Sequence, residues 1–85
     1  MCKYTAVLSK RAEKTLDSLS DHVATPLLHA IASLEENPRP HGYRKLRGRD
    51  AFRIRAGNYR IIYEIIDDKL IVVIVTVGHR KDVYE

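Results

Sequence analysis

Three arginines within one short segment are the side chains of this chain best suited to chemistry. Arg53, Arg55 and Arg60 lie in residues 52–63, whose sequence is FRIRAGNYRIIY. Guanidinium groups bind phosphate oxygens through paired hydrogen bonds and keep their charge at any physiological pH. For the same reason they are poor general bases. The segment is therefore suited to hold and neutralise a phosphate group, and other residues would have to move a proton.

The alternation of residue types in 52–63 predicts a β-hairpin with Gly57-Asn58 as its two-residue loop, because glycine tolerates the positive φ that such loops require. With this loop, Arg55 lies opposite Arg60, and Arg53 lies on the same face. Like charges directly opposite each other destabilise a strand pair, so the arrangement predicts an anion between them. The other face carries the apolar residues Phe52, Ile54, Ala56, Tyr59, Ile61 and Tyr63.

Basic residues are concentrated around this hairpin. The 85-residue chain has a net charge of +4, but residues 39–60 hold eight Lys or Arg and one acid, Asp50. The rest of the chain is slightly acidic. A basic segment of this kind is typical of a protein that binds a polyanion, since a merely solvated face would mix both signs. Further phosphate-binding candidates are Arg44, Lys45, Arg47 and Arg49.

Proton transfer has four candidates, which are His79, Glu64, Tyr84 and, more remotely, His41. Imidazole is the side chain that most often serves as a general acid or base near neutral pH, although a lone histidine is more often structural. The carboxylate could instead pair with an arginine. The tyrosine could stack on a base, hydrogen-bond to a leaving oxygen, or only anchor the tail. No glycine-rich phosphate loop, HExxH motif or nucleophile elbow is present.

Several classes of protein are excluded by composition and spacing. A single cysteine, Cys2, excludes an internal disulfide framework and any Cys-based zinc site. His22 and His29 lack a third ligand at metal-site spacing, so we expect no metal and no cofactor. No secretory signal pattern opens the chain, and apolar runs such as residues 70–75 are too short to cross a bilayer. We expect a cytoplasmic protein without a membrane partner.

The first part of the chain predicts one strand and two helices. Residues 3–8 alternate as a strand, and Ser9 is a suitable N-cap for a helix over residues 10–19. A second helix extends to about residue 36, where an Asn-Pro-Arg-Pro sequence ends it. Pro26 is unfavourable inside that helix, so we expect a boundary or a kink near Thr25.

The second part predicts a loop and a meander. Residues 38–51 form a polar, basic connector in which Tyr43 and Leu46 are expected to be anchors. The second hairpin strand continues to Ile66, residues 67–69 turn, and residues 70–77 form a strand that is apolar on both faces. Residues 78–85 follow as a polar tail.

The element order β-α-α-β-β-β predicts an α+β fold in a single domain, residues 1–85, with a helical hairpin packed on one face of a four-stranded, mainly antiparallel sheet. The first strand should flank residues 70–77, in either orientation, which leaves residues 52–56 at the other edge. The arginines then lie on the open face. Whether the tail or a partner helix covers Ile62 and Ile66 there stays open.

Four motifs resemble the RelE branch of the RelE/ParE toxins. They are KLRG at 45–48, the FRIR…YRIIYEI hairpin at 52–65, DDKL at 67–70 and VGHRKDVY at 77–84. Each motif is short and permissive, but their order and spacing are specific, and the resemblance covers nearly the whole chain.

The resemblance implies a type II toxin that enters the ribosomal A site and cleaves mRNA there, without a metal, by 2′-hydroxyl attack. It also implies a RelB-like antitoxin that binds through a helix and neutralises the toxin. The family's phosphate-binding and catalytic cations fall on Arg53, Arg55, Arg60 and Arg80, and its catalytic or stacking tyrosine falls on Tyr84. The best-known members carry lysines at the first two positions, so the resemblance leaves proton transfer here to His79 or Tyr84.

Two other functions remain open at this point. A ParE-like toxin that inhibits DNA gyrase without nuclease activity would share the fold. The tail residues His79, Arg80 and Tyr84 favour the nuclease, because ParE-like tails commonly lack the aromatic end. A plain nucleic-acid-binding module without turnover is the third possibility.

Overall fold

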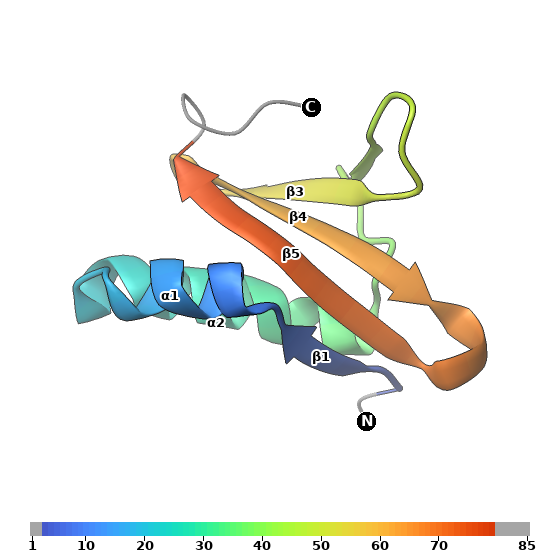
Figure 1. Ribbon diagram of the computed structural model, residues 1–85, viewed down its shortest axis with the longest axis horizontal. Coiled ribbons are helices and arrows are strands. Elements are labelled where there is room, and N and C mark those ends of the chain that lie inside the picture. Colours follow the sequence, from blue (N-terminus) through green and yellow to red (C-terminus); the bar gives the residue numbers. More distant parts are fainter. Residues whose placement is uncertain (1–2, 80–85) are drawn as a thin grey trace.

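The structure, a computed structural model that describes residues 3–79, places two helices on one face of a twisted sheet (Figure 1). The strands have the order β1-β5-β4-β3-β2 across the sheet; β1 is parallel to β5, and all other neighbours are antiparallel. The elements in chain order are β1 (Thr5–Leu8), α1 (Lys10–Asp17), α2 (Asp21–Glu36), β2 (Arg44–Lys45), β3 (Phe52–Ala56), β4 (Tyr59–Ile66), the 3-10 turn η1 (Asp67–Lys69) and β5 (Ile71–His79). The α+β fold and the flanking position of the first strand are confirmed.

The prediction of four strands was wrong, because the basic connector contains the short strand β2. Arg44 pairs with Arg53 and Lys45 pairs with Phe52, so β3 is not the edge of the sheet over its first two residues. The Leu46 amide donates to the Ala51 carbonyl at 2.8 Å and closes the loop behind this pair. Two residues are too few to show a two-residue alternation, which is why the sequence pattern does not reveal the strand.

The hairpin has the predicted register. Ala56 lies opposite Tyr59, Arg55 opposite Arg60, and Arg53 opposite Ile62. Gly57 has a φ of 62°, the positive value expected at this loop.

The helices differ from prediction at two points. Ser9 caps α1 as expected, since its Oγ accepts from the Ala12 amide at 3.0 Å, but α1 ends at Asp17 rather than residue 19. The predicted boundary near Thr25 was wrong, because α2 runs from Asp21 to Glu36 with Pro26 inside it. Pro26 is exposed, and so is His22, whose carbonyl lacks its helical donor, so water can reach that carbonyl.

The main core lies between the helices and the sheet. It includes Leu27, Leu34, Ile61, Tyr63 and Ile74, all of which are essentially inaccessible to solvent. The apolar face of the hairpin packs against this core, as predicted. Within residues 3–79, no helix is long and apolar enough to cross a membrane.

The last strand is longer than predicted and contains a bulge. Gly78 and His79, which we expected in the tail, belong to β5. Ile62 of β4 pairs with Thr76, whereas the next residue, Tyr63, pairs with Ile74. One extra residue of β5 is therefore accommodated there, which increases the local twist of the sheet.

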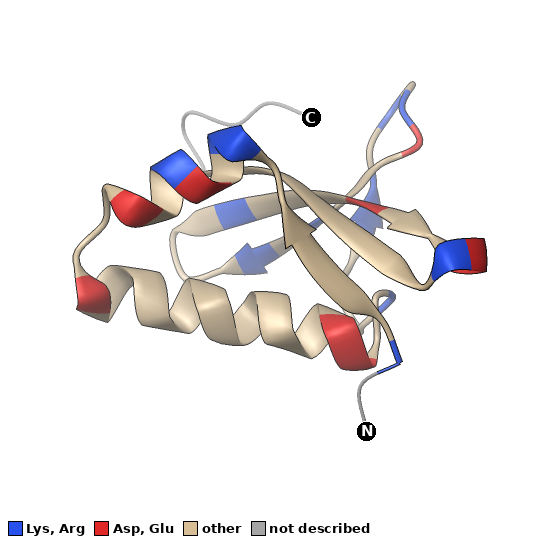
Figure 2. Cartoon of the chain, turned by 60° about the horizontal axis from the view of Figure 1, so that its bottom comes forward, with Lys and Arg blue, Asp and Glu red and all other residues tan. Residues whose placement is uncertain are grey.

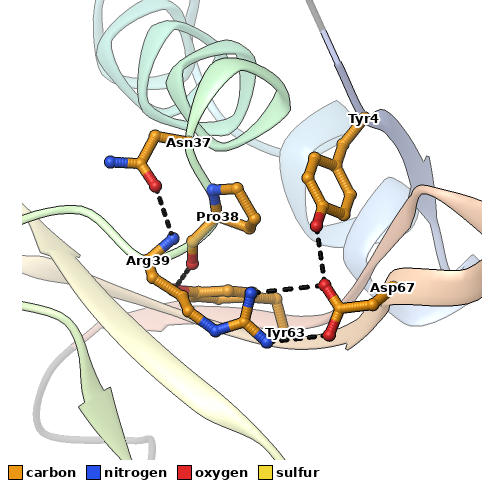
Figure 3. Close-up of polar contacts among 6 residues, drawn as sticks. All are labelled: Tyr4, Asn37, Pro38, Arg39, Tyr63 and Asp67. Atoms are coloured by element: carbon orange, nitrogen blue, oxygen red, sulfur yellow. Dashed lines mark hydrogen bonds and ion pairs between the residues drawn. The ribbon is translucent and has the colours of Figure 1, made fainter.

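One corner of the molecule is held by a polar network that joins three distant segments (Figure 3). The Asp67 carboxylate accepts from the Tyr4 hydroxyl at 2.6 Å and from both terminal nitrogens of Arg39, at 2.9 and 3.3 Å. Beside it, the buried Tyr63 hydroxyl donates to the Pro38 carbonyl at 2.7 Å. The network ties β1 and the loop after α2 to the turn between β4 and β5.

This network predicts a loss of stability at acid pH. Hydrogen bonds from Arg39 and then Tyr4 lower the pKa of Asp67 from 3.8 to about 2. Because the folded pKa lies below the unfolded value, the contribution is complete above about pH 4 and is lost as the pH falls towards about 2. We expect Asp67→Asn to lower the melting temperature at pH 7 and to flatten its pH dependence over this range, measured by circular dichroism. Asp68→Asn, one residue along the same turn, is the matched control; identical profiles for the two variants would contradict the role of the network.

Candidate functional site

Four guanidinium groups lie on one face of three adjacent strands, the face opposite the helices. Arg44 of β2 is paired with Arg53 of β3, and Arg55 of β3 is paired with Arg60 of β4. Residues directly paired across antiparallel strands share a face, so these four side chains form one cationic surface, called here the arginine face. Figure 2 shows basic residues on these strands and the preceding loop, whereas acidic residues mark the ends of α2. The position of Arg44 on this face was not predicted, because the two residues of β2 show no strand pattern.

The arginines of this face differ in exposure. Arg55 is exposed, Arg60 is half-buried, and Arg53 is 8% exposed. The expectation that Arg53 lies on an open face was therefore wrong. Its cross-strand neighbour Ile62 belongs to a second apolar cluster that covers this part of the sheet. Arg55 and Arg60 are the pair that a ligand can approach.

The second apolar cluster shows what covers Ile62. Leu46 and Ala51, from the two ends of the β2–β3 loop, pack with Ile62, and all three are nearly inaccessible to solvent. Within residues 3–79, the connector therefore supplies the side chains that pack on Ile62 from outside the strand. The role of Leu46 as an anchor is confirmed.

On the helix side of the sheet, contacts between aromatic rings hold the same connector in place. Tyr43 packs on Phe52 with ring centroids 5.6 Å apart, and Phe52 packs on Tyr63 at 5.9 Å. The connector is therefore held by contacts on both faces of the sheet, and its basic side chains point to solvent. Arg44, Lys45, Arg47 and Arg49 are all exposed.

His79 is not brought to the arginine face. It is paired with Tyr59, and the two rings meet edge to face with centroids 5.6 Å apart on the helix side of the sheet. Its neighbour Gly78 is the residue opposite Arg60. A proton transfer by His79 to a group held between Arg55 and Arg60 would require the ring to leave this contact.

Of the other proton-transfer candidates, Glu64 and His41 have described positions, and Tyr84 lies outside the described residues. Glu64 shares the alternation of Arg60 but is four residues further along β4, about 13 Å away. His41 lies with Arg44, Arg53 and Arg55 along a groove at the edge of the sheet. Arg80 and Tyr84 lie outside the described residues. Within residues 3–79, no group of three or more His, Cys, Asp or Glu side chains could hold a metal ion.

Comparison with known proteins gives the family. Residues 6–84 match the family model described as ParE toxin of type II toxin-antitoxin system, parDE. The chain belongs to this toxin family. The "mRNA interferase toxin RelE" of Escherichia coli is 33% identical over 81 residues, which cover 92% of this chain and 84% of that protein. The chain is thus a RelE-like toxin of the type II toxin–antitoxin class.

Solved structures support the same family. The toxin in the intact E. coli RelBE toxin–antitoxin complex superposes with a TM-score of 0.77 at 33% identity, over 89% of this chain and 95% of that one. The archaeal RelE–RelB complex from Pyrococcus horikoshii gives a TM-score of 0.82 at 28% identity, over 95% and 99% of the two chains. The helix-on-sheet arrangement described above is therefore the arrangement of RelE toxins.

Because Leu46 holds the connector in place, we expect its replacement to lower the stability of the protein strongly, although Leu46 contacts no ligand. Leu46→Ala removes a fully buried side chain from a small cluster, so we expect a loss of about 2–5 kcal/mol in the free energy of unfolding, measured with urea. Arg47→Ala, the next and exposed residue, should leave that free energy nearly unchanged. Equal values for the two variants would show that the cluster does not hold the connector.

Proposed function

We propose that this RelE-like toxin is an endoribonuclease that cleaves mRNA in the ribosomal A site and thereby inhibits translation. The observation that carries the proposal is the pair Arg55 and Arg60, held directly opposite each other on an accessible face. Two guanidinium groups at paired positions can both bind one phosphate, which makes the pair a suitable anion site. The name of the E. coli relative, an mRNA interferase, favours an RNA phosphate as that anion.

The proposed reaction uses the nucleophile of the RNA itself. The 2′-oxygen attacks the adjacent phosphorus, its bond to phosphorus forms, and the bond to the 5′-oxygen of the next nucleotide breaks. The products are a cyclic phosphate and a 5′-hydroxyl. One proton leaves the 2′-hydroxyl and one joins the leaving oxygen. The protein aligns the reacting atoms and neutralises the charge that develops on the phosphate, and no metal is needed for either task.

The residues of the arginine face have different roles in the proposed reaction. Arg55 and Arg60 contact the phosphate whose bond is cleaved, with Arg80 as a third catalytic cation. Arg53 is buried beside them and contributes positive charge to the site from within the sheet. The exposed basic side chains of the connector bind the flanking backbone: Arg44, Lys45, Arg47 and Arg49.

For proton transfer, we propose Tyr84 rather than His79. Arginine cannot serve as a base, and the His79 ring packs on Tyr59 on the opposite side of the sheet. We assign Tyr84 to the leaving oxygen or to stacking on a base, and we assign the His79 ring to holding the end of β5 against β4.

The proposed partners are the ribosome with its mRNA and a RelB-like antitoxin. Solved relatives at 28–33% identity are complexes of RelE with RelB. An antitoxin helix that runs along the open sheet face would place apolar residues on Val7, which is 46% exposed, and on the partly exposed Ile66, and acidic residues on Arg55 and Arg60. Binding there would cover the phosphate site and neutralise the toxin.

Loss of one phosphate-binding arginine should abolish toxicity without unfolding the protein. We expect Arg60→Ala and Arg80→Ala each to relieve growth arrest on induced expression and to lower mRNA cleavage about 10²–10³-fold, because a developing charge loses a preorganised donor. Primer extension on a translated mRNA measures the cleavage, and circular dichroism checks the fold.

Lys14→Ala, an exposed change on α1, is the matched control and should remain toxic. If Arg60→Ala and Arg80→Ala both stayed fully toxic, the catalytic assignment would be wrong. If the wild-type protein were harmless on expression, the toxin proposal itself would fail and a plain binding module would remain.

A second candidate function is inhibition of DNA gyrase without nuclease activity, which the description of the matching family model as a ParE toxin favours. The two functions share a fold and are separated by their targets. New cleavage ends in mRNA during induction would support the nuclease. A change in plasmid supercoiling without such ends would support the gyrase inhibitor.

The placement of His79 gives a separate prediction. His79→Phe keeps an aromatic ring against Tyr59 and removes both ring nitrogens, so we expect cleavage to change little compared with the loss in Arg60→Ala. Primer extension with both variants makes the comparison. A loss in His79→Phe as large as that in Arg60→Ala would instead assign proton transfer to His79.

A further inference from the structure

A groove of about 590 Å³ runs along the edge of the sheet, between α2 and β3. Its apolar floor is Ile54, which is partly exposed, and Ala30 of α2 borders it. Its rim includes His41, Arg44 and Arg55. The groove lies beside the arginine face and shares Arg44, Arg53 and Arg55 with it, but the reaction described above assigns no role to its α2 side.

The groove exists because β2 is short. Only Phe52 and Arg53 of β3 are paired with β2, so β2 does not cover the edge of β3 from Ile54 onward. On the other side, Ala30 and Ser33 of α2 form a wall with small side chains. Short pairing and a small-residue wall together leave room for a ligand of limited size.

The lining of the groove is rich in basic residues. None of the residues that line it is acidic, while Arg44, Arg53 and Arg55 bring guanidinium groups and His41 brings ring nitrogens. Guanidinium groups bind phosphate bidentately, and an apolar floor suits the flat face of a nucleobase. The volume lies within the range of small-ligand sites, about 300–1,000 Å³, and suits one nucleotide better than a helix about 10–12 Å across.

We propose that this groove binds the nucleotide of the RNA strand adjoining the cleaved bond. The base lies on Ile54 and against Ala30, and the phosphate of that nucleotide lies at Arg44 and His41. Arg55 belongs both to the groove and to the pair with Arg60, so the strand passes around the edge of β3 from one site to the other. This inference rests on the proposed RNA substrate, and it makes α2 a part of the substrate-binding surface.

Binding can be tested without cleavage by using RNA that lacks the nucleophile. A fluorescein-labelled 2′-O-methyl hexanucleotide is titrated with the protein, and fluorescence anisotropy measures the dissociation constant. Two variants probe the groove: Arg44→Gln removes a rim charge, and Ser33→Tyr fills the groove from the α2 side. Their matched controls are Lys69→Gln, an exposed cation elsewhere, and Ala32→Tyr, the neighbouring exposed residue that does not line the groove.

We expect both groove variants to weaken hexanucleotide binding about tenfold, and both controls to bind as the wild type does. Arg44→Gln should also reduce the slope of log affinity against log salt by about 0.7, the value for one phosphate contact with a single strand. Ser33→Tyr should leave that slope unchanged, because it removes no charge. Unfolding in urea confirms that all four variants fold.

Three outcomes would overturn the proposal. Groove variants that bind the hexanucleotide like the wild type would exclude the groove from the RNA path. An equal loss of affinity for adenosine monophosphate alone would indicate a site for small anions and not for a strand. An equal loss of affinity for hexaglutamate would indicate an acidic peptide as the occupant.

The inference and the proposed function can fail separately. If primer extension shows no mRNA cleavage by the wild type while both groove variants weaken hexanucleotide binding, the groove is an RNA site and the nuclease proposal is wrong. If the wild type cleaves mRNA and the groove variants bind RNA normally, the nuclease stands and the groove assignment is wrong.

Discussion

The register of the hairpin between β3 and β4 is the constraint on which the site depends. Gly57, at a φ of 62°, closes the loop so that Arg55 meets Arg60 and Ile54 meets Ile61. A shift of one residue would turn the arginines into the core and the apolar residues outward, so the buried face holds the register in place. The core that fixes Ile61 and Tyr63 therefore also stabilises an unfavourable pair of like charges on the opposite face.

The basic connector shows how a polar loop gains a definite position in a small domain. Leu46 and Ala51 bury themselves against Ile62 on one face, and Tyr43 packs on Phe52 at the other. At the far end of the sheet, Asp67 joins β1 and the loop after α2 to the turn before β5. These contacts involve few residues, and the connector side chains Arg44, Lys45, Arg47 and Arg49 are exposed to solvent, where a partner can bind them.

The family and the chemistry of the site are separate conclusions. Membership of the toxin family follows from the match over residues 6–84 and from the shared fold. A nuclease and a gyrase inhibitor can share that fold, so function has to be argued from the arginine face and its surroundings. The face can hold and neutralise a phosphate, whereas the position of His79 against Tyr59 separates that histidine from the charged pair.

Elements with a clear period and the pairing of the hairpin could be predicted from the sequence, because alternation and a glycine loop are local signals. The sequence also identified the arginines, the cap at Ser9 and the anchor Leu46. It did not reveal β2 or the burial of Arg53, because both depend on contacts between segments distant in the chain, nor the continuity of α2 through Pro26, where the unpaired carbonyl is open to water. The face that His79 occupies follows from strand pairing and a bulge, so it can be read only from the folded chain. The tertiary structure also created the groove beside Arg44, which forms where a two-residue strand ends and a helix passes nearby.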